Sequence, residues 1–221
     1  MSATAPHADP IRQYLETART QIAKGELRQA AETLNKAQKK SPNDARVFML
    51  AGLMAEKAGN VKGAFEALRK SVALAPTWGP GLLELALLLA RQNQFQEAEE
   101  TAEKVAKLEP KNLLVLAGVV DIAHRAGHAE MAVRHLRRGL ELVPGDVQLR
   151  RLLAADLEGL GQHAEALDVW NGLIAQDPKD QQALLGRVKT LLAAGKPAQA
   201  AADTTTLLEL APGDSVYAYY S

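Results

Sequence analysis

Two histidines and an aspartate close together are the side chains of this sequence that most resemble a metal site. Asp121, His124 and His128 lie in the stretch DIAHRAGH. Helical zinc sites place two histidines four residues apart on one face, and metalloproteases add a glutamate between them. Here Gly127 ends the predicted helix between the two histidines, and HRAGH contains no glutamate. We therefore predict no metal ion, and we expect Asp121 and His124, together with Arg125, to be polar contact residues.

Other residue patterns that support catalysis are missing from the sequence. The chain has no cysteine, which excludes thiol nucleophiles and cysteine-ligated zinc. The stretch GKPAQA at 195–200 lacks the upstream glycine and the following serine or threonine of a phosphate-binding loop. No serine has a neighbouring base that would activate it. We predict that the isolated chain is not an enzyme and that it holds no cofactor.

Composition and charge favour an all-α protein. Hydrophobic residues make up 47% of the chain but aromatic residues only 4%, so alanine and leucine must form the core. Both are good helix formers. The 26 Lys and Arg residues balance 26 Asp and Glu residues, whereas a nucleic-acid-binding protein usually shows a basic excess. We therefore expect no nucleic acid among the partners.

The most apolar stretch, GLLELALLLA at 81–90, is too short to cross a membrane. A spanning helix needs about 20 apolar residues, and Arg91 follows this run directly. The N-terminal sequence MSATAPHADP has no apolar region of the kind that a signal peptide requires. We expect a cytoplasmic protein that does not enter the membrane.

Three columns of residues recur at intervals of 34 residues along the chain. Proline cannot continue a helix and ends it, while a recurring alanine leaves room for two helices to cross closely. Glycine and asparagine tolerate the left-handed backbone that often follows a helix. Each repeat is therefore predicted to be a pair of antiparallel helices. The prolines are Pro42, Pro76, Pro110, Pro144, Pro178 and Pro212, the alanines are Ala30, Ala64, Ala98, Ala132, Ala166 and Ala200, and the turn residues are Gly25, Gly59, Asn93, Gly127, Gly161 and Gly195.

This period and the alanine-to-proline spacing resemble the tetratricopeptide repeat family. The first helix of repeat three carries the family's large–Leu–small–large columns as Leu82, Leu85, Ala86 and Leu89. The resemblance implies an all-α fold, an α-solenoid that forms a right-handed superhelix of six antiparallel helix pairs plus the start of a seventh. The six repeats are 11–44, 45–78, 79–112, 113–146, 147–180 and 181–214.

The first, fifth and sixth repeats depart from the family pattern. Thr17, Gln21, Arg150 and Arg187 stand in columns that the family fills with apolar residues, so we expect looser packing toward the two ends. Residues 1–9 are expected to form a mobile N-terminal tail.

Residues 215–221 are expected to begin a further helix. Tyr217, Tyr219 and Tyr220 stand where a solenoid normally has a polar capping element. We therefore expect that the polypeptide continues beyond Ser221, or that another chain covers this end, with self-association as one possibility.

The resemblance also implies a concave surface that is lined by the first helices and holds a peptide or a partner segment. A second stripe on each first helix faces this surface; it is mainly apolar in repeats one to three and charged in repeats four to six. It offers anchors for an amphipathic or extended segment. In the alternative reading, neighbouring first helices pack on each other along this stripe and leave little surface for a ligand. The predicted groove residues are Leu15, Arg19, Met49, Leu53, Lys57, Leu83, Leu87, Arg91, Asp121, His124, Arg125, Arg151 and Lys189.

The charge of the predicted groove favours an acidic partner. Eight basic residues on this surface oppose five acidic ones. Arginine binds carboxylates through a two-pronged contact, so an acidic segment or a free C-terminal carboxylate would suit it. The alternative is ordinary solvated charge with no partner.

We predict a non-catalytic protein–protein interaction module that binds a peptide or partner segment in its concave groove. The alternative is an N-terminal domain that recruits substrate or drives oligomerisation in a larger bacterial enzyme, such as a transferase, a methyltransferase or an oxygenase. Repeats of this family often precede such domains.

Overall fold

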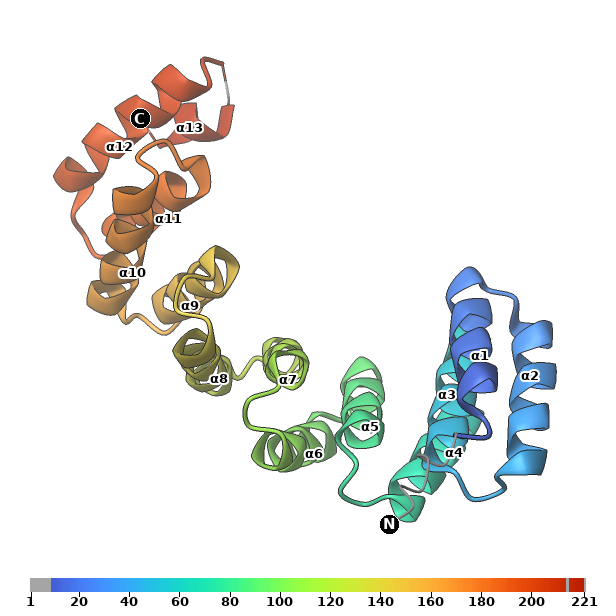
Figure 1. Cartoon of the computed structure of the whole chain (residues 1–221). Coiled ribbons are helices and arrows are strands. Elements are labelled where there is room, and N and C mark those ends of the chain that lie inside the picture. Colours follow the sequence, from blue (N-terminus) through green and yellow to red (C-terminus); the bar gives the residue numbers. More distant parts are fainter. Residues whose placement is uncertain (1–8, 214, 221) are drawn as a thin grey trace, which may run out of the picture. The chain divides into compact units, whose positions relative to one another are not determined.

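The computed structural model describes residues 9–213 and 215–220, except for the side chains of Ser215 and Ala218 (Figure 1). Every regular element within these residues is a helix, as predicted. Residues 1–8 of the predicted tail at 1–9 lie outside the described residues, whereas Asp9 is described and is bound by Arg46. The helices are α1 (Arg12–Lys24), α2 (Leu27–Lys40), α3 (Ala45–Lys57), α4 (Val61–Leu74), α5 (Gly79–Arg91), α6 (Phe95–Leu108), α7 (Leu113–Ala126), α8 (Ala129–Leu142), α9 (Val147–Gly159), α10 (His163–Gln176), α11 (Gln181–Ala193), α12 (Pro197–Leu210) and α13 (Ser215–Tyr219).

Consecutive helices form antiparallel pairs, α1 with α2 through α11 with α12, and helices of neighbouring pairs pack on each other within each compact part of the chain (Figure 1). This arrangement confirms the predicted α-solenoid. The chain divides into two compact parts, an N-terminal part that ends at Pro110 and a C-terminal part that begins at Lys111. Each part carries its own inner surface.

The glycine and asparagine column forms the turn inside each pair. Gly25, Gly59, Gly127, Gly161 and Gly195 have φ between 70° and 82°, and Asn93 has φ of 59°. In each turn the following amide donates back to a carbonyl of the first helix, as Gln94 N does to Leu89 O at 2.9 Å. The left-handed residue therefore reverses the chain without leaving these helix-end carbonyls unsatisfied.

The alanine column marks the contact between paired helices. Ala30, Ala64, Ala98, Ala132 and Ala166 are completely buried, and Ala200 is 2% exposed. Each of the six prolines follows two residues after a second helix ends. Both sequence predictions are confirmed.

The charged residues in the core columns of the last repeats are held by hydrogen bonds. Arg150 turns toward the preceding loop and donates to Pro144 O at 3.0 and 2.6 Å. Arg187 donates to both carboxylate oxygens of Asp203, at 2.7 and 2.6 Å, and to Asn171. These arginines are therefore tolerated where the family normally has apolar side chains.

The tyrosines of α13 do not all remain uncovered, contrary to the prediction. Tyr217 is buried and packs in the cluster of Leu184, Val188 and Leu191, and its hydroxyl donates to Gln181 Oε1 at 3.0 Å. Tyr219, by contrast, is exposed. Tyr217 thus covers the apolar end of the last helix pair.

No described helix combines the length and the apolar character needed to cross a membrane.

Candidate functional site

The inner surface of the N-terminal part is formed by three first helices that lie next to each other. Helix α1 packs against α3, and α3 packs against α5. The apolar stripe on these helices includes Leu15, Leu53, Leu83 and Leu87, and all four are half-buried. They contact neighbouring helices and still present part of their side chains to solvent, so both readings of the stripe hold in part.

Met49 does not belong to the exposed stripe, contrary to the prediction. It is only 4% exposed. The reason is its position on the middle helix, because α1 and α5 flank α3 while α4 packs behind it. Met49 is therefore a core residue.

Most predicted polar contacts of this surface are already paired within the chain. Arg91 binds both carboxylate oxygens of Glu56, and Lys57 Nζ donates to Ala23 O at 2.7 Å. Arg19 is exposed. The basic side chains of the inner surface thus serve mainly to join successive first helices.

The charge excess predicted for the groove is absent from the N-terminal part. Arg46 binds the carboxylates of Asp9 and Asp44, and its guanidinium lowers the pKa of both aspartates. The eight basic and five acidic residues counted from the sequence did not include these two aspartates. With these two included, five basic residues oppose five acidic ones. The surface therefore has no net preference for an acidic partner.

Glu84 is an acidic residue of this surface that forms no hydrogen bond with the described residues. It is half-buried between the leucine rows of α5, and none of the described residues donates a hydrogen bond to it. Burial raises the pKa of Glu84, while the charges of Arg91 and Arg19 oppose that rise and Glu56 adds to it. The carboxylate of Glu84 thus lies beside the leucine row and is partly withdrawn from solvent.

The inner surface of the C-terminal part is more polar, and its charges are also paired. Arg125 Nε donates to Asp121 Oδ2 at 2.8 Å, and His124 Nε2 lies 2.8 Å from Asp156 Oδ2. Figure 1 shows the first helices that carry these residues, α7 and α9.

Arg151 and Asp180 form a second pair on this surface, at 2.6 Å. Burial opposes ionisation of Asp180, but hydrogen bonds from Arg151 and from the amides of Ala183 and Gln182 outweigh it and lower the pKa of Asp180. Lys189, also predicted to line the groove, is exposed.

The side chains of Asp121, His124 and His128, which the sequence analysis weighed as a metal site and rejected, are held apart. His124 pairs with Asp156, and His128 lies at the start of α8. Among the described residues, no three His, Cys, Asp or Glu side chains converge on one point.

An apolar pocket of about 260 Å³ lies between α7, α8 and α9, and the sequence reasoning missed it. Two small residues among its lining, Ala117 and Gly139, are the sequence signal that would have revealed it. The other repeats hold Leu15, Met49, Leu83, Arg151 and Leu185 at the place of Ala117, and Ala37, Ser71, Val105, Leu173 and Leu207 at the place of Gly139. The leucine and valine side chains of the lining are Leu113, Leu116, Val120, Leu136, Val143, Leu149 and Leu152.

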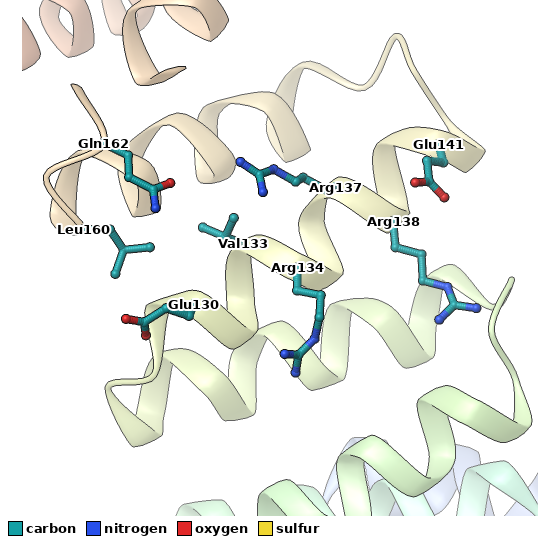
Figure 2. A pocket seen from close by; sticks show the side chains of 8 residues that line it. All are labelled: Glu130, Val133, Arg134, Arg137, Arg138, Glu141, Leu160 and Gln162. Carbon is teal, nitrogen blue, oxygen red and sulfur yellow. The ribbon is translucent and has the colours of Figure 1, made fainter. Parts of the chain in front are cut away.

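A larger and shallower cleft of about 690 Å³ lies along α8. Three arginines line it, but their guanidinium groups point in different directions (Figure 2). Arg137 extends toward Gln162, whereas Arg134 and Arg138 turn away from it. Arg137 is also bound to Glu165 at 2.5 Å. The three charges do not converge, so the cleft lacks the geometry of an anion site.

Comparison with known proteins agrees with the repeat architecture. Among solved structures, YrrB, described as a TPR protein with an unusual peptide-binding site, has 17% identity and a TM-score of 0.68 over 84% of this chain and 96% of that one. Pseudomonas aeruginosa PilF matches at 18% identity and a TM-score of 0.67, over 95% of this chain and 96% of its own. At these identities the likeness shows the fold alone.

A curated relative is the cellulose synthase operon protein C of Xanthomonas axonopodis pv. citri (strain 306). It is 28% identical over 180 residues, which are 78% of this chain but only 12% of the relative. The chain therefore spans a small fraction of the length of that protein.

A family model described as tetratricopeptide repeat matches residues 15–77, 83–147 and 148–215. These segments include most of the chain and follow the helix pairs described above. The family is one of protein-interaction modules and not of catalytic domains. The chain belongs to the tetratricopeptide repeat family.

Proposed function

We propose that this chain is a non-catalytic module that binds a segment of a partner protein on the inner surface of α1, α3 and α5. The observation that supports this most directly is the row of half-buried leucines, Leu15, Leu53, Leu83 and Leu87, on adjacent first helices. Neighbouring apolar side chains of this kind offer anchor positions for an amphipathic or extended segment.

The partner segment is proposed to be apolar rather than acidic. The arginines Arg46 and Arg91 are neutralised by carboxylates of this chain, so an acidic segment would have to displace existing ion pairs. An apolar segment with one hydrogen-bond donor would cover the leucines and satisfy Glu84, whose burial is only partly offset by Arg91 and Arg19.

The second candidate function is a recruiting or oligomerisation domain within a larger protein. The match to 12% of the cellulose synthase operon protein C of Xanthomonas supports it, because the matched segment is a small part of that long chain. Both candidates give these repeats the same binding role.

The test uses peptides selected from a displayed random library on the wild-type protein. Replacing Leu53 and Leu87 with glutamate should weaken the binding of those peptides at least about tenfold, because each introduces a charge into an apolar contact. Helical content by circular dichroism should stay unchanged. Leu192→Glu, at an exposed leucine of α11, is the control and should leave the affinity unaltered.

Two outcomes would reject the proposal. If the double variant binds the selected peptides as well as wild type does, the leucine row is not the site. If the double variant unfolds, Leu53 and Leu87 are core residues and the row offers no surface to a ligand.

A further inference from the structure

We propose that the apolar pocket between α7, α8 and α9 binds an indole ring, the side chain of a tryptophan in the partner segment. This inference rests on the proposed function, and it names the chemistry of one anchor. The pocket lies in the C-terminal part of the chain, whereas the leucine row lies in the N-terminal part, so the two can be tested separately.

The pocket exists because two neighbouring helices lack bulk at the same place. Ala117 on α7 and Gly139 on α8 both line it. A methyl group on Gly139 would reach 3.1 Å from Leu149 Cδ1, so leucine from α9 already approaches that position closely. The remaining space beside Ala117 is where other repeats place a leucine or a methionine.

The rim of the pocket exposes apolar surface that the fold itself does not cover. Leu113 is 41% exposed and Leu152 is 42% exposed, and both line the pocket. Because both leucines line one pocket, their exposed surfaces belong to a single apolar patch rather than to scattered residues. The rim would close over the edge of an inserted ring.

The size of the pocket fits an aromatic side chain. Its volume is about 260 Å³, and an apolar cavity of roughly 150 Å³ in another protein is large enough to bind benzene. A ring system with two fused rings therefore has sufficient room.

The polar edge of the pocket selects an aromatic ring that carries a donor. Asp146 is the one carboxylate among the lining residues, and its Oδ1 accepts from Leu149 N at 2.9 Å. Its Oδ2 accepts no hydrogen bond from the described residues, and a carboxylate offers acceptor sites only. Asp146 is exposed at the rim, where an indole N–H, which is a donor only, would hydrogen-bond this oxygen, while a phenyl or leucine side chain has no donor to offer it.

The first experiment is a titration of the wild-type protein with N-acetyl-tryptophanamide, followed by NMR of the leucine and valine methyl groups. We expect saturable shifts at Leu116, Leu136, Leu149 and Leu152. The amides of N-acetylated phenylalanine, tyrosine, leucine and lysine are the competing probes, and each should bind more weakly. The absence of saturable shifts, shifts at other methyl groups, or equal affinity for any competing probe would overturn the proposal.

Two variants test the pocket and its acceptor. Ala117→Leu restores the side chain of the other repeats and fills the pocket, so it should abolish the shifts. Ala155→Leu, on an exposed alanine of α9 outside the pocket, is its matched control and should keep them. Asp146→Asn retains a good helix-capping residue and should weaken the tryptophan probe about tenfold, as expected for one charge-assisted hydrogen bond, without affecting the phenylalanine probe.

The outcomes separate this inference from the proposed function. If Ala117→Leu still shows the shifts, the ligand lies elsewhere and the inference fails. If that variant does not fold, the wild-type shift map decides the location. The groove on α1, α3 and α5 is judged by the Leu53 and Leu87 variants alone, so either idea can fail while the other stands.

Discussion

Arg91 in repeat three and Glu56 in repeat two hold each other through two contacts, with Nε 2.5 Å from Oε1 and Nη2 2.8 Å from Oε2. The two side chains are 32% and 22% exposed. The pair joins α5 to α3 on the inner surface, and it directs the Nε and Nη2 donors of Arg91 to a carboxylate of the chain itself. A residue predicted to bind the partner thus serves first to hold two repeats together.

Removing this pair should cost little stability. We expect Arg91→Ala to lower the free energy of unfolding by about 0.5–1 kcal/mol, the range of partly exposed ion pairs, in urea titrations. Glu56→Gln should have a similar effect, and the double variant should cost less than the two single effects combined. Additive losses would show that the contact contributes no coupling.

Met49 and Leu53 should respond very differently to truncation, although they share one stripe in the sequence. Met49→Ala should destabilise the fold by about 2–5 kcal/mol, because it empties a buried position. Leu53→Ala should cost roughly 1 kcal/mol, since its side chain is only half-buried. The measurement is chemical denaturation of both variants under identical conditions, and equal losses would contradict the burial described for them.

Alanine substitutions at two helical glycines, Gly186 and Gly172, should change stability in opposite directions. A methyl group on Gly186 would lie 2.5 Å from Cζ2 of Trp170, whereas one on Gly172 would meet nothing within 4 Å. Gly186→Ala should therefore destabilise the protein by about 1–3 kcal/mol through overpacking.

Gly172→Ala should stabilise the protein by about 0.5–1 kcal/mol, the usual helix preference for alanine. Trp170 fluorescence should change in Gly186→Ala and stay constant in Gly172→Ala. Stabilisation by both substitutions would mean that the indole of Trp170 does not occupy the space beside Gly186.

Glu84 should make stability depend on pH in a defined direction. Burial raises the pKa of Glu84 in the folded state, so the folded protein retains this proton at pH values where the unfolded chain has lost it. Its contribution is therefore fully favourable below the ordinary glutamate pKa and declines as the pH rises toward the folded value.

Glu84→Gln removes that loss, so this variant should be more stable than wild type at neutral pH and equally stable in acid. Its expected gain is within about 1 kcal/mol, as for most substitutions outside the core. Thermal unfolding of both proteins across the acidic range measures it. Destabilisation by glutamine at neutral pH would show that the ionised carboxylate has a favourable partner in the fold.

The repeat columns predicted the fold because they reflect constraints that act within each helix pair. Asn93 and the glycines in its column adopt the left-handed turn, and Ala98 is completely buried between two helices. Backbone conformation and close helix contact restrict the residue type directly, so the roles of these positions could be predicted from a single sequence. The core face of Leu82, Leu85, Ala86 and Leu89 followed from the same periodicity.

The binding surface was less predictable because it depends on contacts between repeats. Met49 lies in the same column as Leu83, yet it is buried because α3 has a neighbour on each side. Arg46 is neutralised by Asp9, which lies 37 residues earlier in the sequence. The periodicity within one helix does not predict contacts between residues so far apart. The pocket beside Ala117 depends on the coincidence of a small residue in α7 and another in α8.

The position of Tyr217 affects the order in which the helix pairs unfold. Helix pairs in a row support one another, and a pair with an open side frays first. Tyr217 covers such a side because its ring packs against Leu184, Val188 and Leu191 and its hydroxyl donates a hydrogen bond to Gln181. Proteolytic cleavage after Gly213 would therefore remove the contacts of Tyr217. Unfolding would then begin at the pair α11–α12 and proceed toward the preceding helix pairs.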